Sequence, residues 1–319
     1  MFASLLGLAL SGGLYADTPP APPTPAPGAE ALQEVMVQAP EPKYVAPTRR
    51  DRIGRIWAPV MIDGKGPFRL VLDTGANRSA VTQRTAAALG LPEGMQAVTR
   101  VTGFTGSAVV PTIHVEEMDV GDILIGPAEL PVLDDVFGGA QGVLGYEGLA
   151  NRRIFADFIH DRLVISRSHG ERAPRDFTTV ALRVMHGLLV ADVMVGGVRT
   201  KAIIDTGAQG TVGNLKLRDA LMRHPPRNAA HEEIIGVTLD VQSGDYLPMP
   251  DIRFGERLKV SGVHVTFGDM YLFEHWGLTD QPALTLGMDL LGTFDVMIID
   301  YARHELQIQL HNYSDVRIH

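Results

Sequence analysis

The residues Val71-Leu72-Asp73-Thr74-Gly75-Ala76 are repeated later in the chain as Ile203-Ile204-Asp205-Thr206-Gly207-Ala208. Each copy is an aliphatic pair followed by Asp-Thr-Gly-Ala. In a chain of this length and average composition, one such tetrapeptide arises by chance roughly once in two hundred sequences. Two copies therefore indicate a duplicated structural unit, and this duplication decides the architecture.

Other landmarks recur around the two copies in the same order. A glycine-containing turn between apolar runs, typical of a β-hairpin, precedes each copy. A Gly-x-Thr triplet, an apolar-Gly ending and an Asp-aromatic pair follow each copy. The paired landmarks are 63–66 with 196–197, 103–105 with 236–238, 143–145 with 285–287, and 157–158 with 300–301. We therefore expect two similar lobes.

Short runs rich in Val, Ile and Leu, separated by Gly and Pro, predict a mostly β protein. The runs expected to form strands include 56–62, 68–72, 108–115, 162–166, 188–195 and 296–300. Helices are expected over 82–89 and 215–222, each following a copy of the repeated motif. A short helical turn is expected after each later glycine, at 145 and 287.

Composition excludes several classes of protein. Hydrophobic residues make up 45% of the chain and charged residues 20%, which excludes a wholly disordered chain. No apolar run reaches the ~18 residues of a membrane-spanning helix, so a polytopic membrane protein is excluded. The absence of Cys excludes disulfide scaffolds and thiol nucleophiles. The net charge of −9 argues against a partner that is nucleic acid or an anionic membrane.

The first 47 residues differ in composition from the rest. An apolar run over 2–10, followed by small residues, resembles a secretory signal. We expect residues 1–16 to direct export, to the periplasm or beyond, and to be either cleaved or kept as a membrane tether. An apolar tail on a cytosolic protein, or a start inside a longer signal, is the alternative, because no Lys or Arg precedes the run and Leu14 is not small. Abundant proline predicts an extended linker over 17–47, and the two lobes are expected over 48–168 and 169–319.

The repeated motif carries its own chemistry. An Asp that ends an apolar strand and precedes Thr-Gly is an acid held in a turn that uses the backbone freedom of Gly, and a single one is most often a turn or capping carboxylate. If two lobes pack about a pseudo-two-fold axis, however, Asp73 and Asp205 meet at that axis. Two carboxylates a few ångströms apart share one proton. The ionised one can then take a proton from water while the protonated one polarises a carbonyl, which hydrolyses a peptide bond.

These residues resemble the aspartic proteases, and the retropepsin-like branch more than the pepsin branch, because both copies carry Ala after Asp-Thr-Gly. The resemblance covers about residues 50–312. It implies two similar lobes related by a pseudo-two-fold axis, with the active site between them and both halves supplied by one chain. It implies no cofactor and no metal. The roles that it implies are catalysis for Asp73 and Asp205, bracing of the two loops for Thr74 and Thr206, and close approach for Gly75 and Gly207.

The same resemblance predicts two flaps, one near Gly103 and one near Gly236. It implies that Gly103, Phe104 and Thr105 contact a protein or peptide substrate in extended conformation. The second flap, at 234–246, lacks the Gly-x-x-Gly of the first, so we expect one flap to do most of the closing. The apolar-Gly endings resemble the second signature of the family, although Thr285 departs from it.

Other functional interpretations remain open or are weaker. The histidines beside acidic residues, at 231–233, 274–275 and 304–305, lack the spacing of a zinc-protease helix, and surface or capping roles are expected. A non-catalytic module that binds an extended peptide on the same fold is the main alternative to the enzyme. A dimer in which each chain contributes its motifs to separate sites is the alternative assembly.

Overall fold

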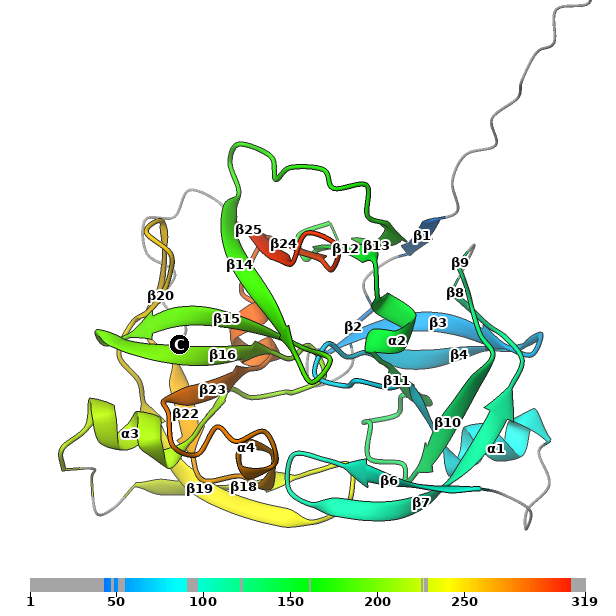
Figure 1. Ribbon diagram of the computed structural model, residues 1–319, viewed down its shortest axis with the longest axis horizontal. Helices are drawn as coiled ribbons and strands as arrows, with labels where there is room; N and C mark the ends of the chain where they lie inside the picture. The colour runs from blue at the N-terminus through cyan, green and yellow to red at the C-terminus, as the bar shows by residue number, and fades with distance from the viewer. Residues whose placement is uncertain are drawn as a thin grey trace, which may run out of the picture. The chain divides into compact units, whose positions relative to one another are not determined.

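The computed structural model describes residues 55–90, 97–120, 123–160, 162–224, 226 and 229–310, and the backbone of 43–46 and 49–50. These residues form many short strands and a few short helices (Figure 1), so the prediction of a mostly β protein is confirmed. The predicted signal-like segment at 1–16 lies outside the described residues. None of the described helices is long and apolar enough to span a membrane.

The N-terminal lobe is a ten-stranded sheet organised around one hairpin. In β3 (Ile56–Ile62), buried residues alternate with more exposed ones, because successive side chains of a strand point to opposite faces. β4 (Lys65–Leu72) runs back antiparallel to β3 and ends directly before Asp73. The other elements of this lobe are β2 (Arg49–Arg50), β5 (Ala80–Thr82), α1 (Gln83–Leu89), β6 (Val98–Thr102), β7 (Ser107–Val115), β8 (Met118–Val120), β9 (Ile123–Ile125), β10 (Ala128–Leu133), β11 (Gly142–Leu144) and α2 (Tyr146–Leu149).

The C-terminal lobe repeats this order of elements. β15 (Leu188–Val195) and β16 (Val198–Ile204) form the equivalent hairpin, and Asp205 follows β16 as Asp73 follows β4. The other elements are β17 (Val212–Gly213), α3 (Leu215–Leu221), β18 (Ala230–Ile235), β19 (Val241–Pro248), β20 (Ile252–Phe254), β21 (Leu258–Val260), β22 (His264–Phe267), α4 (Tyr271–His275), β23 (Ala283–Leu286) and α5 (Met288–Leu291). Helix α4 is an addition, because the corresponding residues 134–141 form a loop without a helix.

In each lobe a later strand inserts beside the strand that leads to the aspartate. β11 runs parallel to β4, and β23 runs parallel to β16. On their other sides, β11 and β23 pair antiparallel with the short strands β5 and β17. The strand order β4-β11-β5-β10 in one lobe is thus matched by β16-β23-β17-β22 in the other, which confirms two similar lobes.

Six strands from both halves of the chain lie side by side and continue through β14 into the sheet of the C-terminal lobe. Their order is β1-β13-β12-β24-β25-β14. Their bounds are β1 (Lys43–Ala46), β13 (Arg162–Arg167), β12 (Arg152–Asp157), β24 (Val296–Asp300), β25 (Glu305–Gln309) and β14 (Thr178–Met185). At the centre, β12 and β24 pair antiparallel over five residues each. β1 lies near the end of the segment predicted as a linker, and its backbone groups pair with the edge of β13.

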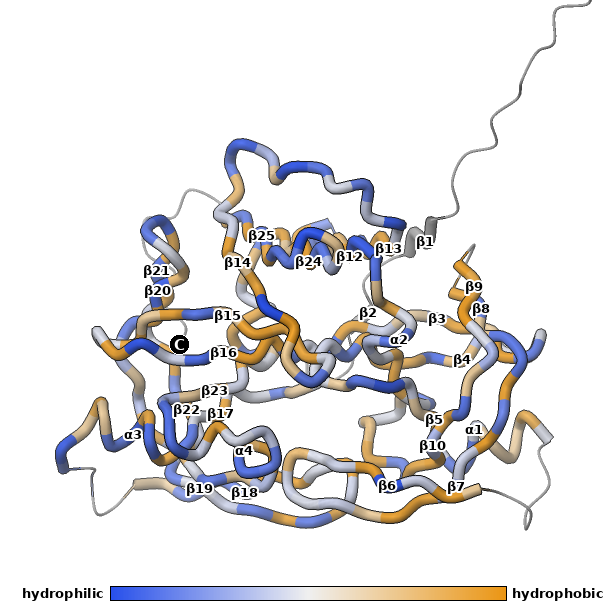
Figure 2. The backbone as a smooth tube through the Cα atoms, in the orientation of Figure 1, coloured by the Kyte–Doolittle hydropathy of each residue, from blue (hydrophilic) through white to orange (hydrophobic). Residues whose placement is uncertain are grey.

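Apolar side chains form one large core and two smaller clusters. Orange and blue alternate along several strands in Figure 2, as expected for strands with one buried face. The N-terminal cluster contains Val71, Ala80, Leu133, Phe137, Ala140 and Val143. The C-terminal cluster contains Leu188, Val190, Ile203, Val212, Met270, Phe273, Leu278 and Ala283. Val71 and Ile203 each precede an aspartate by two residues, so each cluster lies on the strand face that leads to an aspartate.

Local signals in the sequence account for the element boundaries. The strands predicted over 56–62, 188–195 and 296–300 match the bounds of β3, β15 and β24. α1 and α3 begin after Thr82 and Asn214, whose side chains accept hydrogen bonds from backbone N–H groups three residues later. α3 ends at Leu221, one residue before its predicted end, and Met222 is its C-cap. The short helices predicted after the later glycines are α2 and α5.

Candidate active site

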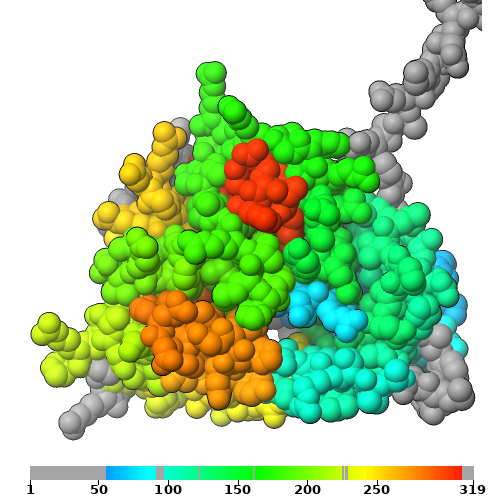
Figure 3. Space-filling view, in the orientation of Figure 1, coloured from blue at the N-terminus to red at the C-terminus, as the bar shows by residue number. Residues whose placement is uncertain are grey.

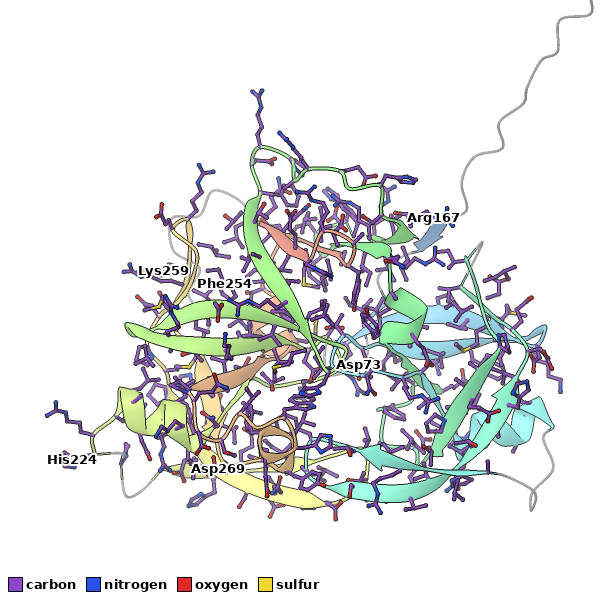
Figure 4. The ribbon with its side chains drawn as sticks, viewed as in Figure 1. Asp73, Arg167, His224, Phe254, Lys259 and Asp269 are labelled. Atoms are coloured by element: carbon purple, nitrogen blue, oxygen red, sulfur yellow. The ribbon has the colours of Figure 1, made fainter. Side chains whose placement is uncertain are left out.

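Two equivalent loops carry the predicted catalytic aspartates, and each is anchored to the inserted strand of its own lobe. The backbone N–H of Asp73 donates to Leu144 O at 3.0 Å, and that of Asp205 donates to Leu286 O at 3.1 Å. Both aspartates are partly buried. Figure 4 labels Asp73 in the middle of the described fold, where the two lobes meet.

The two threonines after the aspartates exchange hydrogen bonds between the lobes. Thr74 N donates to Thr206 Oγ1 at 3.1 Å, and Thr206 N donates to Thr74 Oγ1 at 3.2 Å. Each hydroxyl also donates to the strand behind the other aspartate: Thr74 Oγ1 to Ile204 O at 2.7 Å, and Thr206 Oγ1 to Leu72 O at 2.6 Å. Both threonines are buried. These reciprocal bonds fix one loop against the other.

The glycines of the motif allow the carboxyl groups to approach. A Cβ atom on Gly75 would overlap the carboxyl group of Asp205, and a Cβ atom on Gly207 would overlap that of Asp73. Each loop therefore lies directly against the aspartate of the other loop. The two carboxyl groups hydrogen-bond to each other. One chain thus brings both aspartates together, as expected if a single chain supplies both halves of the site.

A second set of hydrogen bonds supports the outer end of each loop. In the N-terminal lobe, Ser79 N donates to Glu147 Oε1 at 2.9 Å, and Gly145 N donates to Ser79 Oγ at 3.1 Å. In the C-terminal lobe, Thr211 N donates to Asp289 Oδ2 at 2.9 Å, and Gly287 N donates to Thr211 Oγ1 at 3.2 Å. The apolar-Gly endings thus lie against the two loops.

Side-chain environment raises the pKa of both aspartates. Burial raises the pKa of Asp73 above its ordinary range, while hydrogen bonds from the N–H groups of Gly75 and Ala76 and from Asp205 act in the opposite direction. Burial raises the pKa of Asp205 well above its ordinary range, and the negative charge of Asp73 raises it further. Two carboxyl groups in contact cannot both ionise without strong repulsion. A single proton shared between the two carboxyl groups would remove that repulsion.

Tyr301 lies beneath the N-terminal loop. Its ring packs against that of Tyr146, with centroids 5.5 Å apart, and its hydroxyl is buried without a hydrogen-bond partner among the described residues. Burial, followed by the charge of Asp73, raises the pKa of the Tyr301 hydroxyl. Tyr301 therefore stays neutral and adds no charge to the site.

Two hairpins meet at their tips. The N-terminal flap is β6–β7 and the C-terminal flap is β18–β19, and Figure 1 shows them approaching each other along one edge of the fold. A Cβ atom on Gly103 would lie 2.9 Å from Val237, and a Cβ atom on Gly236 would overlap the Thr105 hydroxyl. Both flaps therefore take part in the contact, and the expectation that one flap does most of the closing stays a prediction.

Each flap tip packs on the opposite lobe. Phe104 packs against the C-terminal cluster, its ring 5.9 Å from that of Phe273 at 71°, and its carbonyl oxygen accepts from Leu272 N of α4 at 3.2 Å. Val237 packs against the N-terminal cluster. In Figure 3 a small opening lies where the orange segment around α4, the teal N-terminal flap and a blue segment of the N-terminal lobe meet.

The described residues contain no group of three metal-ligating side chains. His231 contacts Asp245 on the neighbouring strand at 3.2 Å, with its side chain largely exposed.

The predicted site residues fall into two groups in the structure. Asp73, Asp205 and the Thr and Gly residues that follow them come together at one place. Gly103, Phe104 and Thr105 lie at the flap tip and contact the other lobe. Sequence reasoning missed the support from Glu147 and Asp289, although each acid stands two residues after the glycine of the apolar-Gly ending, and this matched spacing could have revealed them.

Comparisons with known proteins identify the family of this chain. A family model described as aspartyl protease matches residues 58–147 and 191–290, one region in each lobe. A solved structure of a retropepsin-like aspartic protease from Rickettsia conorii is 18% identical; the match covers 41% of this chain and 98% of that chain, with a TM-score of 0.32. No curated protein matches. The family model covers more than half of the chain and both copies of the Asp-Thr-Gly-Ala motif, and the chain therefore belongs to the aspartyl protease family.

Proposed function

We propose that this protein is an aspartic endopeptidase, with Asp73 and Asp205 as the catalytic pair. The observation that carries the proposal is the reciprocal approach of the two loops, in which each motif glycine lies against the carboxyl group of the other loop. A buried acid pair is costly for a fold and has no role in simple peptide binding. It is suited to moving a proton between water and a carbonyl.

The proposed reaction uses one water molecule and no covalent intermediate. The ionised aspartate takes a proton from the water as its oxygen attacks the scissile carbonyl carbon, and the protonated aspartate gives its proton to the carbonyl oxygen. The resulting tetrahedral diol then collapses. The aspartate that took a proton from water donates it to the amide nitrogen, a hydroxyl of the diol gives a proton to the other aspartate, and the C–N bond breaks. The products are a carboxylic acid and an amine, and the pair is left with one proton. Sharing of a proton in this way is established for aspartic proteases.

The proposed substrate is a protein or peptide in extended conformation. The apolar clusters beside Asp73 and Asp205 support binding of apolar side chains on both sides of the scissile bond. Gly103, Phe104 and Thr105 are proposed to contact the substrate from the N-terminal flap. Because the flap tips touch each other and the opposite lobes, they must separate for a peptide to enter.

The test is hydrolysis of a denatured protein and of a peptide library, with products identified by mass spectrometry. Asp73→Asn and Asp205→Asn should each abolish cleavage, because Asn cannot exchange a proton with water. The matched control is Asp219→Asn, since Asp219 is exposed on α3. Cleavage that survives either active-site substitution would refute the catalytic pair. Binding of peptides without cleavage by the unmodified protein would favour the peptide-binding module instead.

We further propose that the protein is exported, with a periplasmic location, and that its N-terminal segment is either cleaved or retained as a membrane tether. The apolar run at 2–10 supports this proposal. N-terminal sequencing of the native protein, combined with cell fractionation, tests both parts. An intact N-terminus in the cytosolic fraction would contradict them.

A further inference from the structure

The residues opposite the two aspartates differ between the lobes. In the β3–β4 ladder Trp57 pairs with Val71, so continuing the ladder by two residues places Arg55 across from Asp73. In the β15–β16 ladder Val190 pairs with Ile203, so the same continuation places Leu188 across from Asp205. Residues directly opposite each other in an antiparallel pair have their side chains on the same face. One aspartate therefore faces an arginine and the other a leucine.

Arg55 is held beside the N-terminal loop. Its side chain is buried, with 7% exposure, and its Nη2 donates to Phe137 O at 2.6 Å. Phe137 belongs to the N-terminal cluster together with Val71, which places the guanidinium on the same side of the sheet as Asp73. Leu188, at 1% exposure, belongs to the C-terminal cluster. A buried guanidinium keeps its positive charge, so this difference is one of charge as well as shape.

We propose that Arg55 is a positioning residue that places the single negative charge of the aspartate pair on Asp73, so that Asp73 is the base and Asp205 the acid in the first step of the reaction. The division of labour rests on the proposed function. The location of the negative charge does not rest on the proposed function, because it is a property of the protein without substrate.

The backbone N–H groups also differ between the two loops. Gly207 N and Ala208 N both donate to Asp205 Oδ1 at 2.9 Å, whereas Gly75 N donates to Asp73 Oδ1 at 2.8 Å and the Ala76 N–H is shared with the backbone oxygen of Asp73 at 3.4 Å. These bonds favour a charge on Asp205, so the charge of Arg55 must outweigh them for Asp73 to hold the negative charge. Tyr301, which follows β24, stays neutral because burial raises the pKa of its hydroxyl. The positive charge of Arg55 lowers the pKa of Asp73, opposing the effect of burial. Among the described residues, Arg55 is the charged side chain that acts on one aspartate and is replaced by an apolar side chain, Leu188, in the other lobe.

The charge assignment has a direct consequence for the chemistry. With Asp73 ionised, the water loses its proton to the N-terminal lobe, and the carbonyl oxygen receives a proton from the C-terminal lobe. If Asp73 were the acid and Asp205 the base, Asp73 would have to hold the proton beside the positive charge of Arg55, which that charge disfavours. The substrate peptide is thereby expected to bind in one preferred direction.

The test measures each carboxyl group alone, by ¹³C NMR titration of aspartate carboxyl carbons. In Asp205→Asn the remaining Asp73 faces Arg55, and in Asp73→Asn the remaining Asp205 faces Leu188. We expect the lone Asp73 to titrate about 1 pH unit below the lone Asp205, the lower end of the effect of a neighbouring opposite charge. Adding Arg55→Gln, which keeps a donor for Phe137 O, should remove most of this difference, and Arg55→Lys should preserve it.

The matched control is Arg69→Gln. Arg69 also donates to a backbone oxygen of the same loop, Gly139 O at 3.2 Å, but it is exposed and stacks over Trp57. This change should leave the difference intact. A difference that persists in Arg55→Gln, or a lone Asp205 that titrates below the lone Asp73, would overturn the proposal. A protein that shows the expected titrations but cleaves no peptide would refute the proposed function while leaving the charge assignment in place.

Discussion

Replacing Thr206 by Val tests whether the exchanged threonine bonds hold the two lobes together. Val has nearly the same shape, so packing is kept while the hydroxyl is lost. The substitution leaves two buried backbone groups without their partner, the carbonyl of Leu72, which accepts at 2.6 Å, and the N–H of Thr74, which donates at 3.1 Å. Each such group costs about 1–3 kcal/mol, so the free energy of unfolding should fall by about 2–6 kcal/mol.

The assay is urea unfolding followed by tryptophan fluorescence, with thermal unfolding beside it. A loss in the middle of that range lowers the melting temperature by about 10 °C for a domain of this size. Thr206→Ser is the control, because it keeps the hydroxyl and removes only a methyl group. Thr74→Val should have a similar effect, and the double variant should lose less than the sum, since the two side chains bond to each other's backbone. If Thr206→Val unfolds at the same urea concentration as Thr206→Ser, the reasoning is refuted.

Three further predictions concern the same site. Folding raises the pKa of Asp205 from 3.8. The stability linked to its protonation is therefore fully present below pH 3.8 and is lost as the pH rises through the pKa of the folded state. Asp205→Asn should raise the melting temperature at pH 7 to 8 and bring no gain near pH 3. Gly207→Ala should lower the free energy of unfolding by about 1–3 kcal/mol and abolish cleavage, because the new methyl group overlaps the carboxyl group of Asp73. Gly210→Ala is the control: its Cβ has open space around it, and the change should affect neither stability nor cleavage. Phe104→Ala should weaken the contact between the N-terminal flap and α4, which hydrogen exchange would report as a faster-exchanging Leu272 amide; unchanged exchange would count against that contact.

The repeated motif made much of this molecule predictable. Each aliphatic pair predicts the end of a strand, and the Asp-Thr-Gly-Ala that follows predicts a turn that begins with an acid. Because the motif occurs twice, the same prediction holds in both lobes. The later landmarks at Gly145 and Gly287 were recognisable for the same reason. Thr285, which departs from the expected pattern, is still a β23 residue, and its hydroxyl is buried without a partner among the described residues.

Features that lack a counterpart in the other lobe were not predictable from the repeat. Arg55 corresponds to Leu188, so comparison of the two copies gives no signal for it. The flap contact depends on where two hairpins of different lobes come to lie, and the single Gly236 suffices for close approach to Thr105 without a Gly-x-x-Gly pattern. The pairing of β1 with β13 joins segments far apart in the sequence, and no local pattern specifies it.

The six strands that both halves of the chain contribute to one sheet have a consequence for any half of this chain made alone. β12 obtains its second neighbour, β24, from the other half of the polypeptide. An isolated half would leave that strand with a free edge of unpaired N–H and C=O groups, the kind of surface on which a second strand assembles. Two separate halves that carry β12 and β24 would recover their missing neighbours by associating with each other. The covalent connection between the halves fixes their ratio at one to one, so each half always meets the other half and not a copy of itself. The residues around the two copies of the motif can therefore differ.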